Sequence, residues 1–354
     1  MRNRILMILL ISAFTIHCFA QASGGQIKRK AQPKVRKTTT RRWLDISLFH
    51  EGLASVKGAN QKWGVIDKDG KVIISCKWNY ISPFSEGLAS VENDNGRYGF
   101  IDKTGTLVIP CEWKWVRGFH EGLAEVADDN GKRGFIDKTG KVVIPCQWDN
   151  SMEFSEGLAW VKDSNGKYGY IDKTGKIIIH CVLYNASSFS EGLASVGIKT
   201  TGYDSYIDKT GIVYIKGLWQ YAGEFNDGLA SVIDTNQKWG VIDKLGNMIV
   251  PCQWNAIWSF QDGMARVRND NMKFGFIDRT GKFVVPCKWE SASDFCEGLA
   301  VVKDSNGKYG FIDHTGAIII PCKWEFANSF ENGLAEVHDI YNIFFIDKTG
   351  KIIK

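Results

Sequence analysis

A unit of 35 or 36 residues recurs nine times along this chain, and this repetition constrains the fold more than any other feature of the sequence. The phenylalanine that opens the unit stands at positions 49, 84, 119, 154, 189, 225, 260, 295 and 330. A unit this short cannot bury its apolar side chains alone, so consecutive units must pack against one another. A residue that occurs in every unit is therefore first a part of the scaffold.

One unit reads as three short strands joined by tight turns. In residues 119–148 the strand-like segments are 123–126, 133–137 and 141–148. Asn130-Gly131 and Gly140 lie between them and supply the positive φ that tight hairpin turns require. We therefore expect an all-β protein of nine tandem repeats, each a three-stranded antiparallel meander.

The third segment of each unit indicates which side chains form the core. Ile144, Cys146 and Trp148 share one face by the period of two, whereas Pro145 and Gln147 share the other. A buried tryptophan removes roughly 200 Å2 from water. The predicted structural core comprises Trp78, Trp113, Trp148, Trp254, Trp289, Trp324, Cys111, Cys146, Cys252, Cys287 and Cys322.

These cysteines recur in one phase of the repeat, and we expect them to be small buried thiols. Equivalent positions in stacked units are expected to lie farther apart than the ~7 Å between Cα atoms that a disulfide tolerates. The fifth unit has Gly217 in this phase, which indicates a need for a small residue. Cys296 lies outside the phase and is the thiol whose reactivity deserves a test.

An aromatic residue directly before a glycine opens the second segment of most units, as in Trp63-Gly64 and Tyr98-Gly99. With the Phe-x-Glu-Gly-Leu-Ala opening, the Ile-Asp-Lys-Thr-Gly turn and the Pro-Cys-x-Trp close, residues 43–354 resemble the WG-repeat (KWG-repeat) family of bacteria. The resemblance implies an all-β repeat array in exported or multidomain proteins, without established catalytic chemistry. The sequence departs from the pattern at Arg133-Gly134, Ser205-Tyr206 and Phe344-Phe345. The fifth unit also has one extra residue around 199–204, where we expect an irregular loop.

Two arrangements of the nine units are compatible with the sequence. Trp43 lies six residues before Phe49, the same offset as Trp78 to Phe84, so the N-terminal segment could complete the last unit of a closed propeller-like ring. However, propellers usually have 4 to 8 blades of about 40–50 residues each. We therefore favour an open curved β array and keep the closed ring as the alternative.

The first 42 residues differ in composition from the repeats. Residues 1–20 carry Arg2 and Arg4, an apolar run and a small-x-small site, which predicts a signal peptide. Residues 21–42 are basic and poor in apolar side chains, which predicts a disordered linker. We expect an exported protein, in the periplasm, on the cell surface or outside the cell, and no transmembrane helix in the mature chain.

The charge of the repeats argues against nucleic-acid binding. Ten of the 44 basic residues and none of the 39 acidic residues lie within the first 42 positions, so residues 43–354 hold 34 basic and 39 acidic groups, a net charge of −5. A basic surface for nucleic acid is therefore not expected on the repeats.

The recurring acidic residues are explained by turns, and we expect no enzyme activity, metal or cofactor. Nine aspartates precede the Lys-Thr-Gly turn, where a carboxylate can accept backbone N–H bonds. A second set precedes the glycine of the Glu-Gly turn and suits the same role; no oxygen-rich calcium string or Cys-x-x-Cys zinc pattern accompanies either set. The two sets are Asp67, Asp102, Asp137, Asp172, Asp208, Asp243, Asp278, Asp313 and Asp347, and Glu51, Glu86, Glu121, Glu156, Glu191, Asp227, Asp262 and Glu297.

Recognition is expected where the copies differ. The position x in Glu-Gly-Leu-Ala-x-Val varies widely and reads as an exposed slot, with Trp160 as one occupant. Trp115 and Trp258 also lie outside the core phase, and exposed aromatic rings on a rigid β array can stack on sugars or anchor proteins. We predict a non-catalytic scaffold for a protein or a cell-envelope polymer. The alternative is a lectin-like glycan-binding protein that uses Trp115, Trp160 and Trp258.

Overall fold

The computed structural model describes residues 43–198 and 202–353, and all regular elements in these ranges are β-strands. The predicted signal peptide (1–20) and linker (21–42) lie outside the described residues, as do positions 199–201 of the loop predicted to be irregular. Within the described ranges, no helix has the length and apolar character needed to cross a membrane. The described chain forms two compact bodies, which meet in sequence between Gln253 and Trp254.

The described residues form nine small antiparallel sheets in chain order, eight with four strands and the last with three. The second sheet has the order β5 (Tyr80–Ile81), β6 (Leu88–Glu92), β7 (Tyr98–Asp102) and β8 (Leu107–Trp113). The prediction of an all-β repeat of antiparallel meanders is confirmed. The prediction of three strands is wrong for eight sheets, because a short first strand pairs with the edge of the second. Its two residues in the second sheet are too few to show a sequence period.

The other sheets repeat this pattern. The first strands are β1 (Asp45–Ile46), β9 (Trp115–His120), β13 (Asn150–Ser151), β17 (Asn185–Ala186), β21 (Tyr221–Ala222), β25 (Ala256–Ile257), β29 (Ser291–Ala292) and β33 (Phe326–Ala327). The second strands are β2 (Leu53–Lys57), β10 (Leu123–Ala127), β14 (Leu158–Lys162), β18 (Leu193–Gly197), β22 (Leu229–Ile233), β26 (Met264–Arg268), β30 (Ala300–Lys303) and β34 (Leu334–His338). The third strands are β3 (Trp63–Asp67), β11 (Arg133–Asp137), β15 (Tyr168–Asp172), β19 (Asp204–Asp208), β23 (Trp239–Asp243), β27 (Phe274–Asp278), β31 (Tyr309–Ile312) and β35 (Ile343–Asp347). The fourth strands are β4 (Val72–Trp78), β12 (Val142–Trp148), β16 (Ile177–Leu183), β20 (Val213–Trp219), β24 (Met248–Trp254), β28 (Phe283–Trp289) and β32 (Ile318–Trp324).

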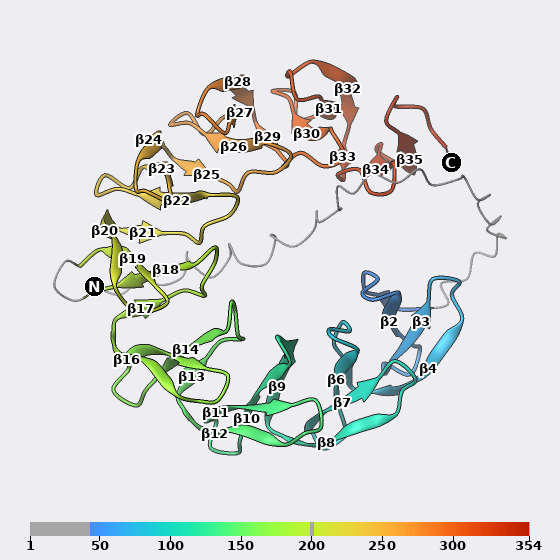
Figure 1. The fold of residues 1–354 in the computed structure, drawn as a ribbon. Helices are drawn as coiled ribbons and strands as arrows, with labels where there is room; N and C mark the ends of the chain where they lie inside the picture. Colours follow the sequence, from blue (N-terminus) through green and yellow to red (C-terminus); the bar gives the residue numbers. More distant parts are fainter. Residues whose placement is uncertain (1–42, 199–201, 354) are drawn as a thin grey trace, which may run out of the picture. The chain divides into compact units, whose positions relative to one another are not determined.

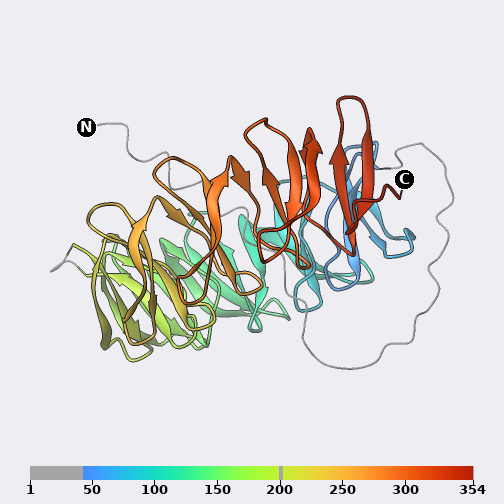
Figure 2. The same ribbon diagram turned by 90° about the horizontal axis from the view of Figure 1, so that it is seen from above.

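Within each body, consecutive sheets stack face to face, and the core lies in the junctions between them (Figure 1). The turned view shows the orange and red sheets of the second body as separate narrow meanders side by side (Figure 2). At the junction of the second and third sheets, Leu88 and Phe100 pack against Phe119 and Ala124. A sheet inside a body thus buries both faces, which is how a 35-residue unit obtains a core.

An edge-to-face aromatic pair marks the centre of these junctions. Phe100 of the second sheet and Phe119 of the third have ring centroids 4.8 Å apart, and both side chains are buried. Such pairs contribute about 0.5–1.5 kcal/mol beyond the area they bury. Equivalent pairs are Phe135–Phe154, Tyr170–Phe189, Tyr206–Phe225, Phe276–Phe295 and Phe311–Phe330.

The glycine of the Trp-Gly motif is required because the fourth strand crosses over it. The register between the third and fourth strands shifts at this point, so the bulged fourth strand comes close to the glycine. A Cβ on Gly99 would lie 2.4 Å from the carbonyl oxygen of Ile109 and 2.8 Å from the amide nitrogen of Cys111. Only hydrogen fits there, and the repeated cysteine lies directly opposite.

In the fifth sheet, the glycine and the residue that carries a side chain have exchanged strands at this crossing. Ser205 stands in the glycine position and Gly217 in the cysteine position, and the Gly217 N–H donates to Ser205 Oγ at 3.0 Å. A Cβ on Gly217 would overlap the carbonyl oxygen of Asp204. The crossing therefore accepts one side chain but not two, which explains why the fifth unit has glycine where the others have cysteine.

The predicted core residues occupy two environments. Trp148, Trp254, Trp289 and Trp324 are buried, whereas Trp78 and Trp113 are half-buried against the cores of their junctions. The repeated cysteines are half-buried at the crossings, and burial raises the pKa of their thiols, to about 11 for Cys252 and Cys287. Cys76, Cys111, Cys146, Cys181, Cys252, Cys287 and Cys322 all lack a disulfide bond.

Candidate functional site: a groove between two repeats

The acids of six Glu-Gly turns bind one sheet to the next. The Glu121 carboxylate accepts the Gly157 N–H at 3.0 Å and pairs with Lys173 Nζ at 3.0 Å, and both partners belong to the following sheet. We call this three-residue contact the clamp. It recurs as Glu51–Gly87–Lys103, Glu86–Gly122–Lys138, Glu156–Gly192–Lys209, Glu191–Gly228–Lys244 and Glu297–Gly333–Lys348.

The acid of the clamp has an unusual backbone conformation. Glu121 has φ +50° and Gly122 has φ +87°, which are the two left-handed residues of a tight hairpin turn. Burial alone would raise the pKa of Glu121, but the Lys173 ammonium and the Gly157 N–H outweigh it and hold this pKa below its usual value. The carboxylate is thus fully used in joining two sheets.

The aspartates before the Lys-Thr-Gly turn act within their own turn. Asp137 accepts the N–H groups of Thr139 and Lys141 at 2.9 and 3.1 Å and the Thr139 hydroxyl at 2.6 Å. The Thr139 hydroxyl is the main reason that the pKa of Asp137 is lowered. Both sets of repeated acids therefore have structural roles.

Cys296 lies in a position that also joins sheets. Its thiol donates to the carbonyl of Phe330, with 3.2 Å from Sγ to oxygen. Ser85 makes the equivalent bond to Phe119 at 2.7 Å, and His120 bonds to Phe154 at 2.7 Å. The thiol singled out by the sequence replaces a serine in a contact between two sheets.

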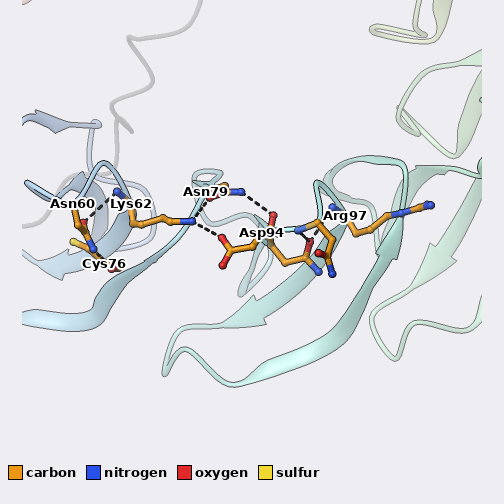
Figure 3. Close-up of polar contacts among 8 residues, drawn as sticks. Asn60, Lys62, Cys76, Asn79, Asp94 and Arg97 are labelled. Carbon is orange, nitrogen blue, oxygen red and sulfur yellow. Dashed lines mark hydrogen bonds and ion pairs between the residues drawn. The ribbon is translucent and has the colours of Figure 1, made fainter.

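A further polar link joins the first two sheets (Figure 3). Lys62, in the turn between β2 and β3, bonds to Asn79 and pairs with Asp94, both of the second sheet. Asn79 in turn donates to the carbonyl of Asn93 at 2.9 Å. Similar pairs are Arg97–Asp129, Lys132–Asp149, Lys273–Glu290 and Lys308–Glu325.

The varying position x, which we call the central slot, is not the exposed position predicted from the sequence. At Glu125, Trp160 and Val301 its side chain points into the junction with the next sheet, and none of the nine occupants is exposed. Ser55, Ser90, Glu125, Ser195 and Val301 are buried, and Trp160, Ser231, Arg266 and Glu336 are half-buried. The slot varies because its occupant must match a different neighbour in each junction.

The three tryptophans proposed as ligand contacts lie in different surroundings. Trp160 packs into the junction of the fourth and fifth sheets, 5.4 Å from the Tyr168 ring. Trp258 is covered by the Arg266 guanidinium at 4.2 Å. All three rings are half-buried, and Trp115 and Trp160 belong to different junctions. Trp115 alone lines the larger of the two described surface cavities.

This cavity is a groove of about 380 Å3 between the second and third sheets. Tyr80, Ser82, Ser90, Glu92 and Tyr98 line it from the second sheet, and Trp115, Val116, Arg117 and Gly118 line it from β9. Tyr80, Glu92 and Tyr98 are paired neighbours across β5, β6 and β7, so they form one row. Burial, and then the negative charge of Glu92, raises the pKa of Tyr98.

Two serines line this groove. Ser90 occupies the central slot, and Ser82 occupies the position eight residues earlier, which we call the flanking slot. Ser82 Oγ accepts the Ser90 N–H at 2.9 Å, so the pair is small and fixed. In the next junction the same slots hold Glu125 and Arg117, whose side chains reach Ser151 and Glu153 of the fourth sheet.

Glu125 is a buried acid that sequence reasoning misplaced on the surface. It is 1% exposed, and its carboxylate pairs with Arg117 Nε at 3.1 Å and accepts the Ser151 hydroxyl at 2.8 Å. Burial raises the pKa of Glu125, although Ser151, Arg117 and Arg133 oppose the shift. The arginine eight residues before an acid in the central slot was the available sequence signal.

The fold and the groove define a tandem β-repeat protein whose sheets are joined by shared residues and whose junctions differ in their slot residues. The family model named WG containing repeat matches residues 63–96, 98–132, 134–168, 168–198, 239–272, 274–309 and 309–337. These segments cover more than half of the chain, which therefore belongs to the WG-repeat family.

Comparison with other proteins adds little beyond the family. No curated protein matches the sequence. The computationally designed protein Ika8 is 14% identical with a TM-score of 0.40, over 77% of this chain and 93% of that chain. BamB from Moraxella catarrhalis is 11% identical with a TM-score of 0.36, over 87% of this chain and 89% of that chain.

Proposed function

We propose that this protein is an exported, non-catalytic scaffold that binds a protein or a cell-envelope polymer. The observation that carries the proposal is a difference between two classes of residue. Residues shared by the units join sheets or close turns. Residues in the central and flanking slots differ between units and determine which junctions are filled by side chains. Glu121 and Asp137 illustrate the shared class, since their carboxylates are occupied by backbone N–H groups and neighbouring side chains. The N-terminal sequence pattern at 1–20 supports export.

The proposed arrangement of the whole protein is an open curved array. Recurrence of the same clamp and aromatic pair in successive junctions supports a regular progression from sheet to sheet. Spin labels attached beside Trp43 and Ile353 test it through the distance between them. A broad distribution at long distance is expected for an open array, and a single short distance would establish the closed ring.

The binding proposal is tested by immobilising the full chain and passing over it separate protein and polysaccharide fractions of a bacterial envelope. Retention of a defined component from one fraction, reduced by Ser90→Trp in the groove, is expected. Retention of neither fraction, or equal retention by the Ser90→Trp variant, would contradict the proposal. A labelled DNA duplex serves as a control ligand that should not be retained, given the net charge of −5 on residues 43–354.

A further inference from the structure

The groove between the second and third sheets combines aromatic faces with hydrogen-bonding groups. Tyr80 and Tyr98 supply aromatic rings from β5 and β7, and residues 115–118 close the groove from β9 of the next sheet. Tyr80 is 42% exposed, which leaves much of its ring available to a ligand. The volume of about 380 Å3 falls within the roughly 300–1,000 Å3 of small-ligand sites.

The Trp115 ring lies on the other side of the third sheet. Its cross-strand partner Ala127 and the Arg133 guanidinium, 4.1 Å from the centre of the ring, share the face that carries Glu125 and meets the fourth sheet. Val116 is the β9 residue whose side chain packs toward the second sheet. The aromatic faces of the groove are therefore those of Tyr80 and Tyr98.

The charge of the groove selects against an acidic ligand. Glu92 contributes a carboxylate to the groove wall. The Arg117 guanidinium does not offset this charge, because it pairs with Glu125 at 3.1 Å and with Glu153 of the fourth sheet at 3.3 Å.

We propose that this groove binds a neutral polysaccharide, with a hexopyranose ring stacked on Tyr80 and its hydroxyls bonded by Glu92. A pyranose ring has an apolar C–H face that suits aromatic rings and a rim of hydroxyls that suits a carboxylate. A purely apolar ligand would desolvate the Glu92 carboxylate without offering it a hydrogen bond, which is costly. The inference rests on the proposed function and names the chemical class of its ligand.

The test is isothermal titration calorimetry of the full chain with cellohexaose and chitohexaose as neutral probes and hexagalacturonate as the acidic probe. Ser90→Trp should fill the groove without unfolding the protein, because Trp160 already occupies the same slot in the fourth sheet. Tyr80→Ala removes one aromatic face. Ser195→Trp is the matched control, since it introduces the same ring into the central slot of the fifth sheet, where Ser187 Oγ accepts the Ser195 N–H at 3.0 Å.

At least one neutral hexasaccharide is expected to bind with a Kd of about 10–1,000 μM. Binding should weaken at least ~10-fold in Ser90→Trp and Tyr80→Ala and stay unchanged in Ser195→Trp. No binding of either neutral probe, preference for hexagalacturonate, or unchanged binding by folded Ser90→Trp would overturn the proposal. If a protein fraction is retained on the immobilised chain while both neutral probes fail, the glycan assignment is wrong and the scaffold function stands.

Discussion

The clamp formed by Glu121 allows charge, hydrogen bonding and backbone strain to be separated by three substitutions at one residue. Glu121→Gln keeps an acceptor for the Gly157 N–H but removes the charge that faces Lys173. Glu121→Ala removes both interactions and keeps a Cβ at φ +50°. Glu121→Gly also removes both interactions but relieves the left-handed strain.

Each variant has a different expected loss of unfolding free energy. The Lys173 pair is partly exposed, with 25% of the Glu121 side chain and 45% of the Lys173 side chain accessible, so its loss should cost only about 0.5 kcal/mol. Loss of the bond to the Gly157 N–H adds about 1–1.5 kcal/mol. Glycine should then recover about 0.5–1 kcal/mol, because strain relief exceeds the extra entropy of the unfolded chain.

The expected order of stability is wild type, Glu121→Gln, Glu121→Gly and Glu121→Ala. Urea unfolding followed by tryptophan fluorescence measures it, with midpoints and slopes compared because long repeat arrays can depart from two-state unfolding. An alanine variant as stable as wild type would refute the clamp. A glycine variant less stable than alanine would refute the role of strain.

The clamp also predicts a pH dependence. The folded-state pKa of Glu121 lies below its ordinary value of 4.5, so its contribution is complete above that value and is lost as pH falls through the folded pKa. The gap in urea midpoint between wild type and Glu121→Gln should therefore shrink between neutral pH and about pH 3. A gap that widened on acidification would reverse the assigned sign.

Three further predictions concern the crossings, the buried acid and the thiols. Gly169→Ser places a Cβ 2.4 Å from the carbonyl oxygen of Ile179 and should lower the free energy of unfolding by about 3 kcal/mol or more. Adding Cys181→Gly should restore at least ~1 kcal/mol, measured as a double-mutant cycle of urea midpoints. Strictly additive effects would contradict the claim that the crossing accepts one side chain but not two. Glu125→Ser should destabilise the chain by about 2–3 kcal/mol, because it leaves arginines beside a buried gap. Adding Arg117→Ser should reduce this loss of stability in a thermal melt. A double variant less stable than Glu125→Ser alone would argue against the Arg117–Glu125 ion pair. The pKa of the Cys287 thiol is about 11, so this thiol should react with a disulfide reagent more slowly in the folded protein than after unfolding. Its reaction rate in the folded protein should keep rising above pH ~9. Equal rates in the folded and unfolded states would show that the crossing does not bury the thiol.

Much of one repeat could be predicted because its signals are local. Gly131 and Gly140 adopt the positive φ expected of their turns, with values of +77° and +86°. Ile144 and Trp148 are buried while Pro145 is exposed, as the period of two in that strand indicates. These features depend on neighbours within a few residues, which sequence patterns report directly.

What the sequence could not show depends on the neighbouring sheet. A period of two separates the faces of a strand, but it does not say whether the second face meets water or another sheet. Position x was therefore assigned to the surface, although Ser90 is 4% exposed. The short strand β5 was missed for a different reason, since two residues contain no period.

The candidate site was only partly predictable. Trp115 could be singled out because it departs from the core phase, and it does line the groove. Tyr80, Glu92 and Tyr98 were not identified, because their proximity arises from the register of β5, β6 and β7. The same pair of serines eight residues apart also occurs at Ser47 and Ser55 and at Ser187 and Ser195, so it does not by itself locate the groove.

The central claim is that shared residues build the array and varying residues recognise the ligand. Amide hydrogen exchange of the full chain, measured with and without whichever neutral hexasaccharide binds, tests this claim most directly. The account predicts slower exchange confined to residues 80–98 and 115–118, which line the groove. Equal protection of the equivalent segments in all nine units would contradict it, because the repeated residues would then be the ones that bind.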